Sequence, residues 1–206
     1  MKVRKIPISF EKQSTQYTCG AKALQLVLNY FNPKKYPLGD YLEMEIFRRA
    51  KLGNYNAVTH PGLALVALEE GFEVEYLMLY EEMFRYPEKV YPGYTMSREE
   101  FEEKVMIDRE YLKKAKEKGL KIVIVKTITG DLLRSYIDRN IPLIGMIDNL
   151  GQLHDIIING YKITKYFSAF YITDPWSGQR GILEKELINL LSTRYGVGIL
   201  AIKNEG

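Results

Sequence analysis

Apolar residues follow two periodicities along the chain, helical in its first half and strand-like in its last third. Residues 19–31 are apolar on nearly every face, which predicts a helix buried at the centre of the fold. A second helix is predicted to begin at Asp40, in a capping box closed by Glu43. A third is predicted from about Pro61 to Glu70, ending at Gly71.

Short β-branched and apolar stretches dominate the rest of the chain. Strands are predicted at residues 72–79, 121–126, 142–148, 153–161, 169–173 and 197–202, with short helices at 130–139 and 184–191. Helices followed by strands that are mostly linked as hairpins indicate an α+β protein. We therefore expect N-terminal helices, one of them central and buried, packed on a C-terminal antiparallel β-sheet.

The segment at about 81–120 differs from its surroundings because charged residues are dense in it. Ser97 and Glu100 have the spacing of a capping box, which predicts a solvated helix reaching about Lys118. We interpret the segment as a surface insertion in a single domain that spans residues 1–206. It is either a lid or partner site, or a charged helix with no function of its own.

Composition narrows the class of protein. The 206 residues carry 29 Lys and Arg against 26 Asp and Glu, and the two signs alternate along the chain. This pattern predicts neither nucleic-acid binding nor a membrane anchor, and no apolar run approaches the roughly 20 residues that cross a bilayer. We expect a cytoplasmic protein, with a residue usage typical of thermophiles. One cysteine and two histidines exclude an internal disulfide and argue against a metal site, and no cofactor is implied.

Cys19 is the first candidate for chemistry because it opens the predicted buried helix. The unpaired N–H groups of a helix N-terminus carry roughly half a positive charge, which favours thiolate over thiol. A neighbouring imidazolium adds to this effect, and such environments lower a cysteine pKa from about 8.5 to roughly 3.5–7.5. The alternative is an inert cysteine that serves as a small apolar residue.

His154 is the candidate base. It opens an apolar strand, whereas His60 lies in a turn that begins a helix and is interpreted as a structural or surface residue. If residues 153–161 and 168–174 form a hairpin with its turn centred near Thr164, His154 lies directly opposite Asp174. Side chains so placed are close enough for the carboxylate to bind the imidazole and fix its tautomer. The alternative is that Asp174 merely begins a turn.

Four segments, in order, resemble a known family. Residues 13–24 (QSTQYTCGAKAL), 141–145 (IPLIG), 154–161 (HDIIINGY) and 171–175 (YITDP) are similar to the active-site segments of family thirty-nine of the papain-like cysteine peptidases. Members of that family remove double-glycine leaders from bacteriocins. The resemblance implies a papain-like fold with Cys19, His154 and Asp174 as the catalytic triad. It also implies that Gln13, six residues before the cysteine, helps to form the oxyanion hole.

The chain departs from the family pattern at two positions near the cysteine. Lys22 replaces the small residue that many relatives carry, and Gln16 is a second glutamine that either competes for the oxyanion role or caps the helix.

The sequence thus predicts a cysteine peptidase or related amide hydrolase that acts on a peptide or small amide substrate. In this mechanism the Cys19 thiolate attacks a carbonyl carbon, His154 transfers the proton and Asp174 orients His154. Tyr17 and Trp176 are candidate substrate contacts, although Trp176 is equally well placed for the core. Two alternatives stay open: an acyltransferase or transpeptidase with the same triad, and a catalytically silent member that binds peptides. Substrate identity and oligomeric state are not indicated.

Overall fold

The buried helix predicted at residues 19–31 is the centre of the fold. The computed structural model describes residues 1–79, 97–149, 152–191 and 198–204. Helix α1 (Cys19–Phe31) begins and ends at the predicted residues, and its positions from Gly20 to Asn29 are buried. The other helices are α2 (Asp40–Ala50), α3 (His60–Glu69), α4 (Arg98–Glu117), α5 (Gly130–Ile137) and α6 (Glu184–Leu191).

An eight-stranded sheet forms the second half of the core. Its strands are ordered β3-β2-β8-β4-β5-β6-β7, and β1 pairs with the C-terminal part of β5, from Gly160 to Ile163. Neighbouring strands are antiparallel except β2 and β3, which are parallel. The strands are β1 (Lys2–Lys5), β2 (Phe72–Met78), β3 (Lys121–Ile124), β4 (Leu143–Asn149), β5 (Gln152–Ile163), β6 (Ser168–Asp174), β7 (Gly178–Leu183) and β8 (Ile199–Asn204).

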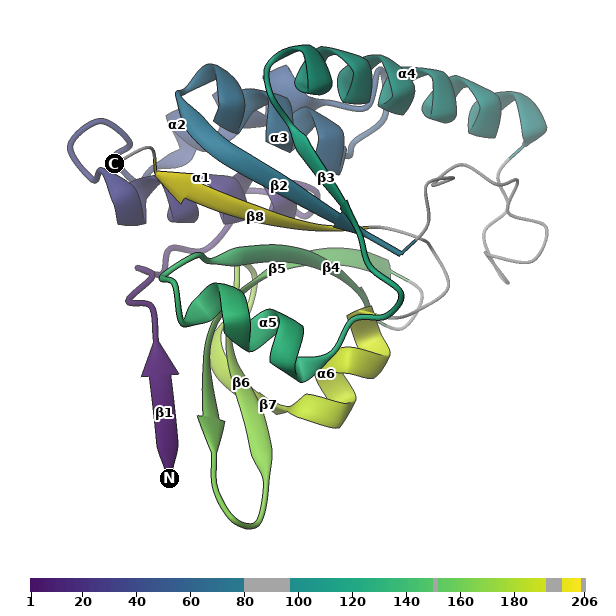
Figure 1. Ribbon diagram of the computed structural model, residues 1–206. Coiled ribbons are helices and arrows are strands. Elements are labelled where there is room, and N and C mark those ends of the chain that lie inside the picture. Colours follow the sequence, from purple (N-terminus) through teal and green to yellow (C-terminus); the bar gives the residue numbers. More distant parts are fainter. Residues whose placement is uncertain (80–96, 150–151, 192–197, 205–206) are drawn as a thin grey trace.

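Helices lie on both sides of this sheet. Helices α1 and α3 pack on one side, against β4, β5, β2 and β8, whereas α5 and α6 contact β4, β5, β6 and β7 from the other (Figure 1). Burial on both faces explains why Ile156, Ile157 and Ile158 are fully buried in succession along β5. The α+β class predicted from the sequence is confirmed.

The hairpin of β5 and β6 has a different register from the one predicted. Near the turn Gly160 pairs with Tyr171, and beyond a β-bulge at Asn159 the ladder continues with Ile157 opposite Thr173. Asp174 therefore falls across from Ile156, not directly opposite His154, and the predicted register was wrong by two residues. A shift of two keeps a side chain on the same face of a strand.

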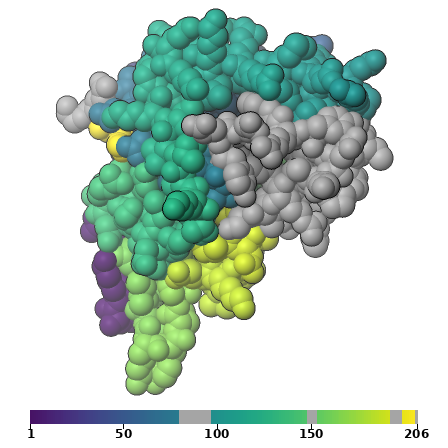
Figure 2. Space-filling model, turned by 45° about the vertical axis from the view of Figure 1, so that its right-hand side comes forward, coloured from purple at the N-terminus to yellow at the C-terminus, as the bar shows by residue number. Residues whose placement is uncertain are grey.

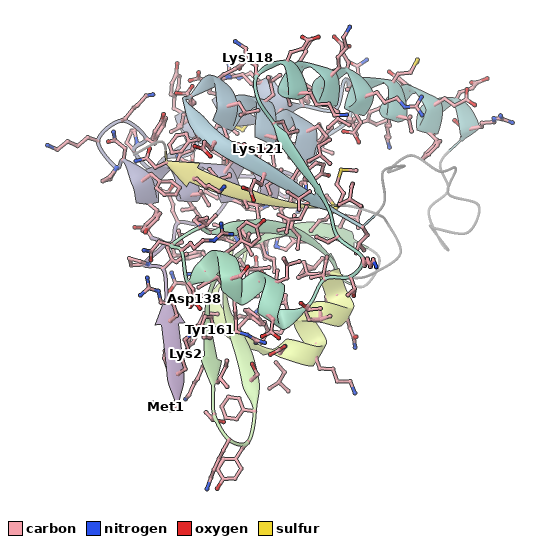
Figure 3. All side chains as sticks on the ribbon, viewed as in Figure 1. Met1, Lys2, Lys118, Lys121, Asp138 and Tyr161 are labelled. Carbon is pink, nitrogen blue, oxygen red and sulfur yellow. The ribbon has the colours of Figure 1, made fainter. Side chains whose placement is uncertain are left out.

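Two edge strands, β1 and β7, were not predicted. Strand β1 is exposed at all four positions, so its sequence shows no alternation that would reveal a strand. An ion pair between Lys2 and Asp138, at 3.0 Å, links β1 to the rest of the protein. The hydroxyl of Tyr161 donates a hydrogen bond to the same carboxylate at 2.5 Å. Figure 3 shows these three side chains together beside β1. Both contacts lower the pKa of Asp138, Tyr161 having the larger effect.

Helix α4 begins as predicted, with Ser97 and Glu100 forming the capping box. It runs along one end of the molecule, opposite the projecting hairpin of β5 and β6 (Figure 2). It is not solvated on every face: Ala115 is fully buried, and the hydroxyl of Tyr111 donates to the carbonyls of Arg49 and Lys51. The part of the expected insertion at 81–96 lies outside the described residues.

Candidate active site

Cys19 is the first residue of α1 and is partly exposed. Thr59, Ser97 and Thr129 cap the N-termini of α3, α4 and α5 with their side chains, whereas in the described part of the chain no side chain caps α1. Thr18, which precedes the cysteine, instead exchanges hydrogen bonds with Thr15. The N–H groups that open α1 are therefore left for another acceptor.

His154 and Asp174 form a hydrogen-bonded pair near Cys19. The Nε2 atom of His154 lies 2.7 Å from Oδ1 of Asp174, and the two side chains are 17% and 7% exposed. Asp174 also accepts hydrogen bonds from the backbone of Trp176 and from the backbone and hydroxyl of Ser177. Burial raises the pKa of Asp174, but the bonds from His154, Ser177 and Trp176 outweigh burial and hold it well below its usual range.

The ring of His154 interacts with Cys19 as well as with Asp174. Burial lowers the pKa of His154, but hydrogen bonds and charge interactions with Asp174 and Cys19 raise it from 6.5 to about 10. Because Asp174 occupies Nε2, Nδ1 is the nitrogen that remains for the cysteine. The structure thus brings together the three residues named from the sequence, and the imidazole interacts with both the sulfur and the carboxylate.

Gln13 is buried in the loop before α1. Its backbone N–H donates to the carbonyl of Pro175 at 2.9 Å, which ties the loop to the residue after Asp174. Its Nε2 donates to the carbonyl of Thr15 at 2.6 Å, and its Oε1 is buried with no partner among the described residues. The amide carries a second N–H that the bond to Thr15 does not use. Gln16, by contrast, is exposed.

A fully buried lysine holds this loop against α1. Nζ of Lys22 lies 2.6 Å from Glu11 and 2.9 Å from Glu43, which is itself fully buried. Glu43 also accepts hydrogen bonds from the backbone and hydroxyl of Ser14, next to Gln13. Glu43 therefore does not cap α2 as predicted; α2 begins after Gly39, and no side chain of the described residues caps it. The signal for this cluster in the sequence was Lys22, a charged residue inside an otherwise apolar helix.

A second histidine–aspartate pair lies beside the cysteine and was not predicted. Nε2 of His60 is 2.7 Å from Oδ1 of Asp155, and the two side chains are 1% and 4% exposed. Nδ1 of His60 lies 3.0 Å from the carbonyl of Gly198, so both ring nitrogens are occupied and neither remains for Cys19. Oδ2 of Asp155 is 4.0 Å from the sulfur of Cys19. The signal for this pair in the sequence was Asp155, an acidic residue in the apolar stretch after His154.

The two aromatic candidates have different surroundings. Trp176 is 45% exposed, with Nζ of Lys12 4.1 Å from the centre of its ring, so it does not pack in the core. Tyr17 is partly buried and packs against Phe47, with ring centres 5.2 Å apart. Trp176 is thus the more accessible of the two.

Two further kinds of site were sought in the structure. Across the described segments, His, Cys, Asp and Glu side chains form no group of three or more that could hold a metal ion. No helix in the same segments combines the length and apolar character needed to cross a membrane.

The fold, with a cysteine opening a buried central helix and a histidine–aspartate pair supplied by the sheet, is that of the papain-like cysteine peptidases. The chain belongs to the Peptidase_C39-like family, whose model matches residues 8–190. The resemblance predicted from the sequence is therefore confirmed. None of the curated proteins compared with the sequence matches it significantly.

Two solved peptidase structures share this fold. One is a double-glycine-motif protease from an AMS/PCAT transporter in complex with the leader peptide, at 18% identity and a TM-score of 0.50 over 98% of this chain and 94% of that chain. The other is the peptidase domain of Streptococcus ComA, a bifunctional ABC transporter of a quorum-sensing pathway. It is 13% identical, with a TM-score of 0.51 over 96% of this chain and 99% of that chain.

Proposed function

We propose that this protein is a cysteine peptidase, or a closely related amide hydrolase, with Cys19 as its nucleophile. His154 accepts the thiol proton and returns it to the leaving amine, while Asp174 holds His154 in the required tautomer. Water then resolves the acyl-enzyme. Membership of a Peptidase_C39-like family supports a papain-like peptidase chemistry.

The observation that carries this proposal is the interaction of the His154 ring with both Cys19 and Asp174. Asp174 engages Nε2 at 2.7 Å, and the interactions with Asp174 and Cys19 raise the pKa of the imidazole to about 10. An imidazole that stays protonated at neutral pH stabilises a neighbouring thiolate. The partial exposure of Cys19 leaves the thiol open to a substrate.

The backbone N–H of Cys19 and the side chain of Gln13 are proposed as the oxyanion donors. The N-terminus of α1 has no side-chain cap among the described residues, and the amide of Gln13 has one N–H beyond the one bound to Thr15. Donors held in place before reaction stabilise the tetrahedral intermediate without reorganising. The bond from Gln13 to Pro175 keeps this donor close to the triad.

A peptide is the proposed substrate. One of the two similar structures is a protease in complex with a leader peptide, which supports a peptide over a small amide. Trp176, exposed and two residues beyond Asp174, is proposed as a contact for the bound peptide.

The test combines a peptide library with a thiol probe. Wild type and Cys19→Ala are incubated with peptides that include double-glycine sequences, with and without an added amine, and the products are identified by mass spectrometry. Cleavage by wild type alone supports the hydrolase, and amide products formed only with the amine identify an acyltransferase. Peptides that are retained but never cleaved would identify a silent binding member.

The chain has a single cysteine, so iodoacetamide reports on Cys19 alone. We expect fast alkylation at neutral pH that is lost in His154→Ala. Slow alkylation with an ordinary titration at about 8.5, unchanged by His154→Ala, would overturn the proposal.

A further inference from the structure

The hydrogen bonds of His60 and Asp155 fix how many protons this pair holds. The carbonyl of Gly198 can only accept, so Nδ1 of His60 carries a hydrogen. At the other nitrogen, 2.7 Å from Oδ1 of Asp155, one proton is shared, as imidazolium with carboxylate or as imidazole with carboxylic acid. Both arrangements are neutral overall. The pair therefore places a carboxyl group beside Cys19 without placing a net negative charge there.

We propose that His60 and Asp155 are positioning residues for Cys19: Asp155 holds the thiol side chain, and His60 neutralises Asp155 so that its charge does not oppose the thiolate. This inference rests on the proposed function of Cys19 as a nucleophile. Both ring nitrogens of His60 are occupied and the pair is almost fully buried, so we assign neither residue a proton-transfer role towards substrate.

The approach of Asp155 to α1 is close enough to constrain the sequence there. A Cβ atom at Gly20 would lie 2.5 Å from Oδ2 of Asp155 and 2.6 Å from Val58. The glycine that follows the cysteine thus makes room for the carboxyl group. Oδ2, the oxygen that faces Gly20, is also the one 4.0 Å from the sulfur.

The charge balance depends on His60 because a bare carboxylate would have the opposite effect. A like charge within a few ångströms disfavours ionisation and typically raises a pKa by about one to three units. The side chain of Asp155 is only 4% exposed, so water screens it little. Removing His60 alone should therefore make the thiol harder to ionise.

Other groups around the pair come from α4, β2 and β5. Asp108 of α4 interacts electrostatically with His60; burial raises the pKa of Asp108 to about 6, against the hydrogen bond from Thr59 and the charge of His60. From β2, the ring of Tyr76 lies 6.1 Å from that of His60, and burial raises the pKa of Tyr76 far above its usual range, so it stays neutral. His154 of β5 faces Cys19.

The test is a double-mutant cycle with iodoacetamide as the probe. The pH midpoint of Cys19 alkylation is measured in wild type, His60→Gln, Asp155→Asn and the double variant. We expect His60→Gln to move the midpoint about one to three units towards alkaline pH, and the double variant to return to within about half a unit of wild type. An unchanged midpoint in His60→Gln, or a double variant displaced as far as His60→Gln, would overturn the proposal.

Gln25→Met is the matched control for disturbed packing. Gln25 is fully buried in α1, and its Nε2 donates to the carbonyls of Pro37 and Gly39. Its replacement changes the stability of the helix but no charge near Cys19, so the alkylation midpoint should stay that of wild type.

A measurement on the unmodified protein covers the case in which the His60 variants do not fold. The chain has two histidines, so ring-nitrogen NMR resolves each of them. We expect Nδ1 of His60 to be protonated and one proton to be shared between Nε2 and Asp155 over the neutral pH range; an unprotonated Nε2 beside an ionised Asp155 would overturn the proposal. Peptide cleavage tests the catalytic role of Cys19 separately, so failure of that role and failure of this cycle are distinguishable.

Discussion

His154 and Asp174 meet diagonally across the hairpin of β5 and β6, and the β-bulge at Asn159 puts them on the same face. Without the bulge, the pairing of Gly160 with Tyr171 would continue to place Asp174 opposite residue 157, on the other face of β5. Asn159 is held by its Nδ2 bond to the carbonyl of Ile6 and by the bond that its backbone carbonyl accepts from the Ile6 N–H. The N-terminal segment thus stabilises the irregularity on which the site depends.

Asp174→Asn should lower the pKa of His154 by about one to three units from its value of about 10. The carboxylate raises that pKa by hydrogen bonding and by charge, and asparagine removes the charge. In wild type, the stability contributed by protonated His154 is complete below 6.5 and is lost as pH rises through about 10. NMR titration of the ring measures the change. Asp131→Asn, at a side chain 94% exposed, is the control and should leave the titration unaltered.

Gln13→Ala should lower kcat/KM for a cleaved peptide by about 10²–10³-fold, the typical cost of one oxyanion donor. Iodoacetamide alkylation forms no oxyanion, so its rate at Cys19 should not change. Gln16→Ala is the matched control, because Gln16 is exposed three residues before the cysteine; it should change kcat/KM by no more than about two-fold. Equal losses in the two variants would contradict the role of Gln13.

Lys22→Met should destabilise the protein by about 3–5 kcal/mol, because it leaves Glu43 buried without its cation. Chemical denaturation measures the free energy of unfolding. Lys22→Met combined with Glu43→Gln should recover part of the loss. The control Lys35→Met breaks a pair with Glu70 at the surface and should cost no more than about 1 kcal/mol. A similar loss of stability in both single variants would show that the buried pair of Lys22 and Glu43 contributes no more than an ion pair at the surface.

Gly20→Ala should destabilise the protein by about 1–3 kcal/mol and displace Asp155, because the added methyl group has no room. Gly181→Ala in β7 is the control: its Cβ would meet nothing closer than the carbonyl of Phe170 at 4.0 Å. Thermal unfolding compares the two variants. If Gly20→Ala is as stable as Gly181→Ala, Asp155 does not approach the helix as closely as described.

Strong local patterns in the sequence predicted most of the elements. The helices at 19–31 and 184–191 have the predicted bounds, because an apolar pattern and its flanking residues specify a helix without distant contacts. The predicted cap of α2 was wrong because Glu43 forms an ion pair with Lys22 of α1, a contact that the local sequence does not specify. Strands β1 and β7 were missed because edge strands take their identity from the neighbour with which they pair.

Only part of the candidate site could be predicted. Cys19 was named from its place at a helix start, and His154 with Asp174 from hairpin symmetry, and the structure brings these three together. Their catalytic roles stay predictions. The pair of His60 with Asp155 joins α3 to β5, and no local pattern specifies such a contact. An acidic residue within an apolar strand is a signal that a partner is needed, but this signal was not used in the prediction.

The chain's own pattern of side chains determined the class of fold, the central helix and the candidate reactive groups, because these follow from local periodicity and residue chemistry. The tertiary structure alone decided the bulged register that brings Asp174 of β6 to His154 of β5, and which charges surround the sulfur. Register and burial depend on contacts between segments more than a hundred residues apart in the sequence, such as Asn159 with Ile6 and Asp155 with Cys19. The energies of those contacts cannot be evaluated until the chain has folded.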